Sequence, residues 1–263
     1  MKHKLKNTHL LDNAQHGCRP TRSTIAPTTN KILTYDIART TKSPGHFLEN
    51  DAAAAFDLVI PALGTLTSYA YGIPLNACLC LYNTATSAKH FIRTGYGVSN
   101  LHYTSSPPNP LFGCGQGSGA SPIIWTLTMD TIIKSVTKTN IIGTYLQDPN
   151  GTITSNRIFD AFVDDTCITA LSTPPPDIIS HEINASPMSR MRKLAQEFTN
   201  KLHATGGKLN LNKCHIVSLT WNKTTRQILH QEEETLIIKD PCTKSSTEIT
   251  KLSTSDAYRT LGY

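Results

Sequence analysis

The sequence lacks the features that mark several common classes of protein. It contains no run of 18 apolar residues, so we expect no transmembrane helix and no membrane partner. Its basic start, MKHKLKNTHLLD, has no apolar core, which argues against a secretory signal. The 7 cysteines are odd in number, include no C-x-x-C pair and fit no metal-binding spacing. We therefore expect reduced thiols in an intracellular protein that is not secreted.

The sequence also lacks a standard phosphate-binding loop. The stretch GCGQGSGASP, residues 113–122, is rich in glycine, but no Gly-Lys-Ser/Thr follows, and Ser118 stands where G-x-G-x-x-G has its last glycine. What remains is a flexible backbone that carries one amide side chain, Gln116, into the start of a helix. Such a site suits close approach to a nucleotide or a nucleic-acid backbone. A plain Gly-rich connection is the alternative.

The composition describes a globular chain. Hydrophobic residues make up 38% of the 263 residues and charged residues 17%, which is enough for one large domain or two small ones. The formal net charge of +6 favours a polyanionic partner. The apolar patterning predicts mixed α and β structure with antiparallel hairpins and no β-α-β alternation. We expect helices at 25–41, 55–71, 75–88, 121–138 and 187–204, and strands at 46–51, 89–94, 99–104, 157–163, 166–171, 215–222, 227–231 and 235–240.

One predicted hairpin carries two adjacent carboxylates. In FVDDTCITA, residues 162–170, Asp164 and Asp165 interrupt a run of strand formers, and we expect both acids at the hairpin tip. Two such charges about 4 Å apart repel by roughly 4 kcal/mol at an effective dielectric near 20. A divalent cation would offset that repulsion, and hard cations prefer carboxylate oxygens. A solvated Asp-Asp turn is the alternative.

A second acidic segment strengthens the metal hypothesis. In ENDAAAAFD, residues 49–57, a predicted strand ends on Asp51, and Phe56 and Asp57 follow after four alanines. A carboxylate at this strand end, beside the Asp164-Asp165 hairpin, would complete a two-metal site. The alternative is that these acids cap a helix N-terminus.

In this order the motifs resemble those of reverse transcriptases. D-x4-F-D at residues 51–57 is similar to the family's first carboxylate motif, Q-G-x-x-x-S-P at 116–122 to its nucleotide-pocket motif, and F-V-D-D at 162–165 to its Y-x-D-D box. GGKLNLNKC at 206–214 and YRTLGY at 258–263 resemble two later segments. QHGCRPTRST at 15–24 resembles a segment of the non-LTR retroelement and group II intron enzymes, so the resemblance spans nearly the whole chain.

The resemblance implies an α+β right-hand polymerase palm, with an antiparallel sheet backed by helices. It also implies partial fingers at residues 1–45, a palm at 46–263 and no complete thumb, as in a fragment of a larger polyprotein or the relic of a retrotransposon. The implied activity is RNA-directed DNA polymerisation, with an RNA template, a DNA primer and dNTPs as partners. Two Mg²⁺ ions, with Mn²⁺ as an alternative, would be the cofactors.

The same resemblance implies a role for each matching residue. Metal ligands would be Asp51, Asp164, Asp165 and the carbonyl of Ala52. Phe56 would exclude the ribose 2′-hydroxyl, although core packing is an equally simple role for it. Lys213 would protonate pyrophosphate, or be an ordinary surface lysine. Gln116, Gly117 and Arg19 would contact nucleotide or template, with a solvated arginine as the alternative for Arg19.

The sequence departs from the family's pattern in places that leave rival functions open. The box begins with Phe162 in place of the tyrosine, and all four residues between Asp51 and Phe56 are alanine. A catalytically inactive nucleic-acid-binding remnant is the main alternative. An RNA-dependent RNA polymerase shares the palm, but Phe56 weighs against it. An unrelated Mg²⁺ phosphotransferase would need a phosphate loop that the sequence does not offer.

Overall fold

The computed structural model describes residues 10–115, 118–148, 150–152, 154–172, 185–222, 224–229 and 234–253. Its centre is a five-stranded sheet with the order β13-β10-β1-β8-β7. The strands are β1 (Gly45–Asn50), β7 (Phe159–Phe162), β8 (Asp165–Leu171), β10 (His215–Leu219) and β13 (Thr250–Leu252). β1 is antiparallel to both of its neighbours, and only β13 runs parallel to its partner. The predicted α+β fold with an antiparallel-rich sheet is confirmed.

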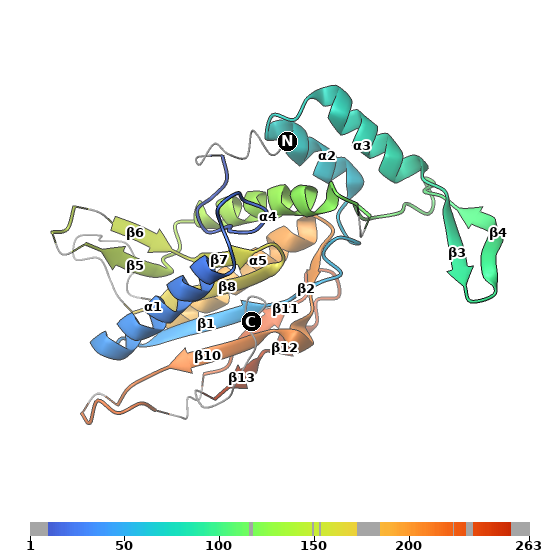
Figure 1. Cartoon of the computed structure of the whole chain (residues 1–263). Helices are drawn as coiled ribbons and strands as arrows, with labels where there is room; N and C mark the ends of the chain where they lie inside the picture. The colour runs from blue at the N-terminus through green and yellow to red at the C-terminus, as the bar shows by residue number, and fades with distance from the viewer. Residues whose placement is uncertain are drawn as a thin grey trace.

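Helices cover both faces of this sheet (Figure 1). Side chains alternate between faces along β1, so Leu48 packs into the large core shared with α4 (Ser121–Thr137) and α5 (Pro187–Ala204). Phe47 points the other way, into a smaller core with Ala38 of α1 (Ile25–Thr41). The entire β1 strand is therefore buried, as a central strand between two helical layers must be.

Two more helices lie beyond α4. They are α2 (Pro61–Ala70), which packs on α4, and α3 (Leu75–Ser87), which packs on α2. The hairpin of β3 (His90–Thr94) and β4 (Gly97–Tyr103) extends from the end of α3 away from the sheet (Figure 1). The remaining small elements are β2 (Ala52–Ala53), β5 (Thr144–Gln147), β6 (Thr154–Arg157), β9 (Lys208–Leu209), the 3₁₀ turn η1 (Leu211–Lys213), β11 (Ile237–Lys239) and β12 (Ser246–Glu248). No helix within the described residues is long and apolar enough to cross a bilayer.

Most predicted elements are present, and three need correction. The helix predicted at 55–71 begins only at Pro61, because the residue before a proline is disfavoured in the helical region and residues 54–57 form a tight turn. Ser121 is the first residue of α4 and not its N-cap, and its hydroxyl donates to the carbonyl of Gly115 at 2.6 Å. Of the strand predicted at 227–231, the structure shows an isolated bridge between Trp221 and Ile228, and residues 230–233 lie outside the described part.

Candidate polymerase active site

Two neighbouring strands bring the predicted carboxylates together. β1 and β8 are antiparallel, with Asn50 opposite Thr166 as the last pair. Asp51 follows Asn50 in the chain and Asp165 precedes Thr166, so both acids lie at the same end of the sheet. Phe162 pairs with Asp165, so the turn between β7 and β8 consists of Val163 and Asp164. The prediction that both acids occupy the hairpin tip is therefore wrong for Asp165, which begins β8.

The charges of this cluster act on one another. Burial raises the pKa of the Asp164 carboxyl above its ordinary value, its own backbone N–H lowers it, and the negative charge of Asp51 raises it again. Burial also raises the pKa of the Cys214 thiol to about 11, with smaller contributions from the backbone N–H and the charge of Asp51. Asp164 therefore lies in a partly buried site near Asp51, where its ionisation is less favourable than in water.

The turn that carries Asp164 is strained and is held from two sides. Val163 has a φ of +60°, a left-handed conformation that β-branched residues rarely adopt. The buried amide of Gln15 accepts a hydrogen bond from the N–H of Val163 at 3.2 Å and donates to its carbonyl at 3.4 Å. The indole of Trp125, on α4, donates to the same carbonyl at 3.1 Å. These contacts fix the direction in which Asp164 projects, as is common where strain lies at a functional site.

Gln15 and Trp125 are positioning residues that the sequence did not reveal. Gln15 opens the QHGCRPTRST segment noted for its family resemblance, and that membership is its signal, but a single amide in a polar segment gives no periodic sign of its role. The neighbouring Gly17 allows the close approach, since a Cβ at that position would lie 2.4 Å from the nitrogen of Val163. Trp125 follows the Q-G-x-x-x-S-P segment by three residues, and that proximity is the signal that could have identified it.

The Gly-rich loop packs directly on the segment that carries Phe56. The N–H of Gly113 donates to the carbonyl of Val59 at 2.8 Å, and the N–H of Cys114 donates to that of Phe56 at 2.9 Å. Gly113 has a φ of +102°, and an added Cβ would lie 3.1 Å from Asp57 and Phe56 main-chain atoms. The half-buried Phe56 ring lies 6.3 Å from the ring of Trp125. The loop, Phe56, Trp125 and the β7–β8 turn are therefore connected by a chain of contacts.

The other predicted site residues have different surroundings. Ala52 lies in β2, which pairs with β9. Just after β9, the N–H of Asn210 donates to the carbonyl of Asp51 at 2.8 Å. The segment that leads to the exposed Lys213 therefore passes beside the carboxylates. Arg19 is buried, and its guanidinium donates to the carbonyls of Asp12 at 2.8 Å and Gln15 at 3.1 Å. Gln116 and Gly117 lie outside the described residues.

The alternative that the acids of residues 49–57 cap a helix receives no support at Glu49. This residue lies within β1 and forms a buried ion pair with Lys31 of α1. The helix that follows, α2, has Ile60 at its N-cap position and no acid in its first turn. Asp51 is left as an acid at a strand end, which is where the metal hypothesis needs it.

The donor set suits Mg²⁺ better than a metal held by protein alone. Within the described part of the chain, no group of three or more His, Cys, Asp or Glu side chains is arranged to hold a metal ion. Mg²⁺, however, is bound through one or two carboxylates, with water and substrate phosphate completing its octahedron. Asp51, Asp164 and Asp165, which lie at one end of the sheet, fit that mode of binding.

These features define a class of protein: a polymerase palm, in which carboxylates at adjacent strand ends lie beside a nucleotide-approach loop. The family model described as reverse transcriptase (RNA-dependent DNA polymerase) matches residues 1–263, and the chain belongs to that family. Among curated proteins nothing matches the chain.

Solved structures show the same fold in telomerase. Apo telomerase from Candida tropicalis, truncated from its C-terminal domain, superposes with a TM-score of 0.52 at 10% identity, covering 94% of this chain and 43% of that one. Telomerase from Candida albicans, in complex with a fragment of telomeric RNA, gives 0.52 at 12% identity, covering 96% and 39%. The chain thus spans about two fifths of the telomerase chains it matches. At these identities the likeness concerns the fold.

Proposed function

We propose that this chain carries out RNA-directed DNA polymerisation, adding dNTPs to the 3′-hydroxyl of a primer on an RNA template. The observation that carries the proposal is the position of Asp51, Asp164 and Asp165 at one end of the central sheet, in a chain of the reverse transcriptase family. The Q-H-G-x-R-P stretch at 15–20 supports a place near the non-LTR retroelement and group II intron enzymes.

The chain's own residues supply position and charge. Asp51 and Asp164, supported by Asp165 and the carbonyl of Ala52, would hold Mg²⁺. When bound, Mg²⁺ lowers the pKa of the attacking hydroxyl and neutralises charge on the departing pyrophosphate. The Gly-rich loop lets the incoming nucleotide approach the main chain beside Phe56. The Phe56 ring is held by the loop behind it, so it can exclude a 2′-hydroxyl. Lys213 would donate a proton to pyrophosphate.

Primer extension tests the proposal. The chain is incubated with poly(rA)/oligo(dT), dTTP and Mg²⁺ beside the double variant Asp164→Asn, Asp165→Asn. We expect extension by the wild-type chain and none by the variant. Extension by both proteins would refute the assignment of the carboxylates. Binding of the template and primer without extension by either protein would favour the nucleic-acid-binding remnant.

A further inference from the structure

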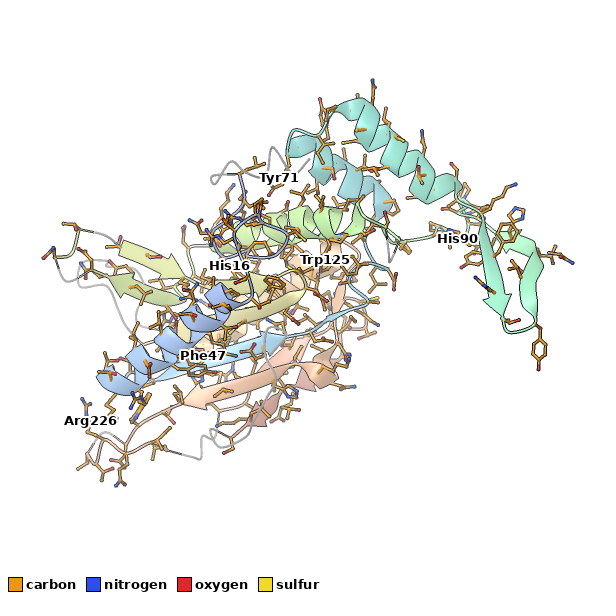
Figure 2. All side chains as sticks on the ribbon, in the orientation of Figure 1. His16, Phe47, Tyr71, His90, Trp125 and Arg226 are labelled. Carbon is orange, nitrogen blue, oxygen red and sulfur yellow. The ribbon has the colours of Figure 1, made fainter. Side chains whose placement is uncertain are left out.

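The β3–β4 hairpin is unusually exposed for a structured element. Ile92 is 63% exposed, Leu101 84% and Tyr96 fully exposed, and the hairpin stands apart from the sheet (Figures 1 and 2). Phe91 and Tyr103 add two half-exposed aromatic rings. Exposed apolar side chains gathered on one element in this way mark an interaction site.

The charge around the hairpin has one sign. The sequence contains no Asp or Glu from residue 58 to residue 129, and the charged residues of that stretch are Lys89 and Arg93, at the start of the hairpin and within β3. Aromatic rings interleaved with cations, on a hairpin that carries no acid, suit single-stranded nucleic acid, whose bases stack on rings and whose phosphates pair with cations.

A cavity of about 570 Å³ lies at the base of the hairpin, between α2, α3 and the Gly-rich loop. The rings of His90 and Tyr103 stack at its wall, 5.0 Å apart and 19° from parallel. Ser68 also lines the cavity, is 1% exposed, and its hydroxyl finds no hydrogen-bond partner among the described residues. A buried hydroxyl without a partner is unfavourable, and a polar ligand atom seated against Ser68 would supply one.

The residues that line the cavity suit a nucleic-acid base better than a phosphate group. Among the described residues that line it there is no lysine or arginine, and the acid is Asp57. A phosphate inside would meet no strong cation, whereas a neutral heterocycle would meet stacked rings, an accepting carboxylate and the Ser68 hydroxyl. Lys89 and Arg93, in the hairpin just outside, are placed for the adjoining phosphates.

We propose that a single-stranded nucleic acid lies along the β3–β4 hairpin and that the cavity at its base receives one unpaired base of that strand. This inference rests on the proposed function, because it names where the template strand would lie. The cavity adjoins the segment that carries Phe56. Gly113 and Cys114 line the cavity, and their N–H groups donate to the carbonyls of Val59 and Phe56.

Binding by the full chain tests the inference without catalysis. The probe is a 12-nucleotide RNA with one central 2-aminopurine, and an otherwise identical RNA with an abasic site at that position is the reference. Tyr103→Ala removes the stacking wall, and Ala85→Phe fills the cavity from α3. Matched controls are Tyr69→Ala, with equal exposure on α2, and Asn83→Phe, on the outer side of α3.

We expect each test variant to bind the 2-aminopurine strand about tenfold more weakly and to lose the quenching of its fluorescence, with both controls unchanged. The double variant Lys89→Gln, Arg93→Gln should reduce the steepness of log affinity against log salt by about 1.4, because each of the two lost phosphate contacts contributes about 0.7. Lys239→Gln with Lys244→Gln, an equal charge change elsewhere, should leave the slope unchanged.

Two results would overturn the inference. One is wild-type affinity in both Tyr103→Ala and Ala85→Phe, which act by opposite changes in volume and are checked for folding by thermal unfolding. The other is equal affinity for free adenosine and the oligonucleotide, which would assign the cavity to a nucleoside and not to a strand. The strand should also bind the Asp164→Asn, Asp165→Asn variant. If the chain binds the strand in this way but extends no primer, the proposed function fails while this inference stands.

Discussion

Replacing Gln15 by methionine should destabilise the chain although no apolar contact is lost. Methionine matches the length of glutamine but cannot accept the hydrogen bonds from the N–H groups of Gly17, at 2.7 Å, and Val163, at 3.2 Å. Gly17 is buried, so its N–H would bear the full desolvation cost of about 1–3 kcal/mol, while the partly buried Val163 would bear less. The carbonyl of Val163 keeps its bond from Trp125. The sum is about 2–4 kcal/mol.

Urea unfolding measures this loss directly, because the free energy of unfolding extrapolates linearly to zero denaturant. Gln147→Met, at an exposed position in β5, is the matched control and should stay within about 0.5 kcal/mol of wild type. Since the same amide holds the strained turn at Val163, Gln15→Met should also slow primer extension under conditions where the variant is folded. A free energy of unfolding within 0.5 kcal/mol of wild type would refute the assignment of Gln15.

Three further substitutions separate stability from function. Asp164→Asn should reduce primer extension at least about a hundredfold. It should also raise the free energy of unfolding at pH 7, because burial and the charge of Asp51 disfavour the ionised carboxyl. A lower free energy of unfolding would contradict this reasoning. Phe56→Ala should increase incorporation of rNTPs relative to dNTPs, measured by the ratio of kcat/KM values, and an unchanged ratio would remove Phe56 from sugar selection. For His46, burial and then the charges of Lys251 and of arginines on α5 lower the pKa from 6.5 to about 4, so its contribution to stability is present above pH 6.5 and lost as the pH falls through about 4. That loss is about 3 kcal/mol, which His46→Gln should remove from the pH dependence of urea unfolding.

The sequence predicted the elements whose apolar spacing and boundary residues agree. The helix at 25–41 has the predicted bounds, and Lys42 ends it in a left-handed conformation. The hairpin of β7 and β8 was predicted from its strand formers, but the position of its turn was not. A one-residue difference in pairing decides whether Asp165 is a turn or a strand residue, and only the register with β1 fixes it.

What the sequence could not supply are contacts between segments far apart in the chain. The hairpin of β5 and β6 has short, mostly polar strands whose fully buried residue is Thr144, so no apolar alternation predicts it. The contact between Gln15 and Val163 spans 148 residues, and neither residue is unusual in its own segment. The meeting of Asp51 with Asp164 was expected from the family resemblance, and the strand pairing provides its physical basis.

The central position of β1 has a consequence for the synthesis of the protein. Asn50, at the end of β1, and His215, at the start of β10, are about 165 residues apart, and β8 lies between them in sequence. At about 5–20 residues per second, translation leaves β1 without its second neighbour for roughly 10–30 s. During that time Phe47 and Leu48 lie on an open strand edge, which is a template for wrong pairing between nascent chains. A ribosome that stops before residue 215 therefore releases a chain with both acidic motifs but an unfinished sheet, prone to aggregate.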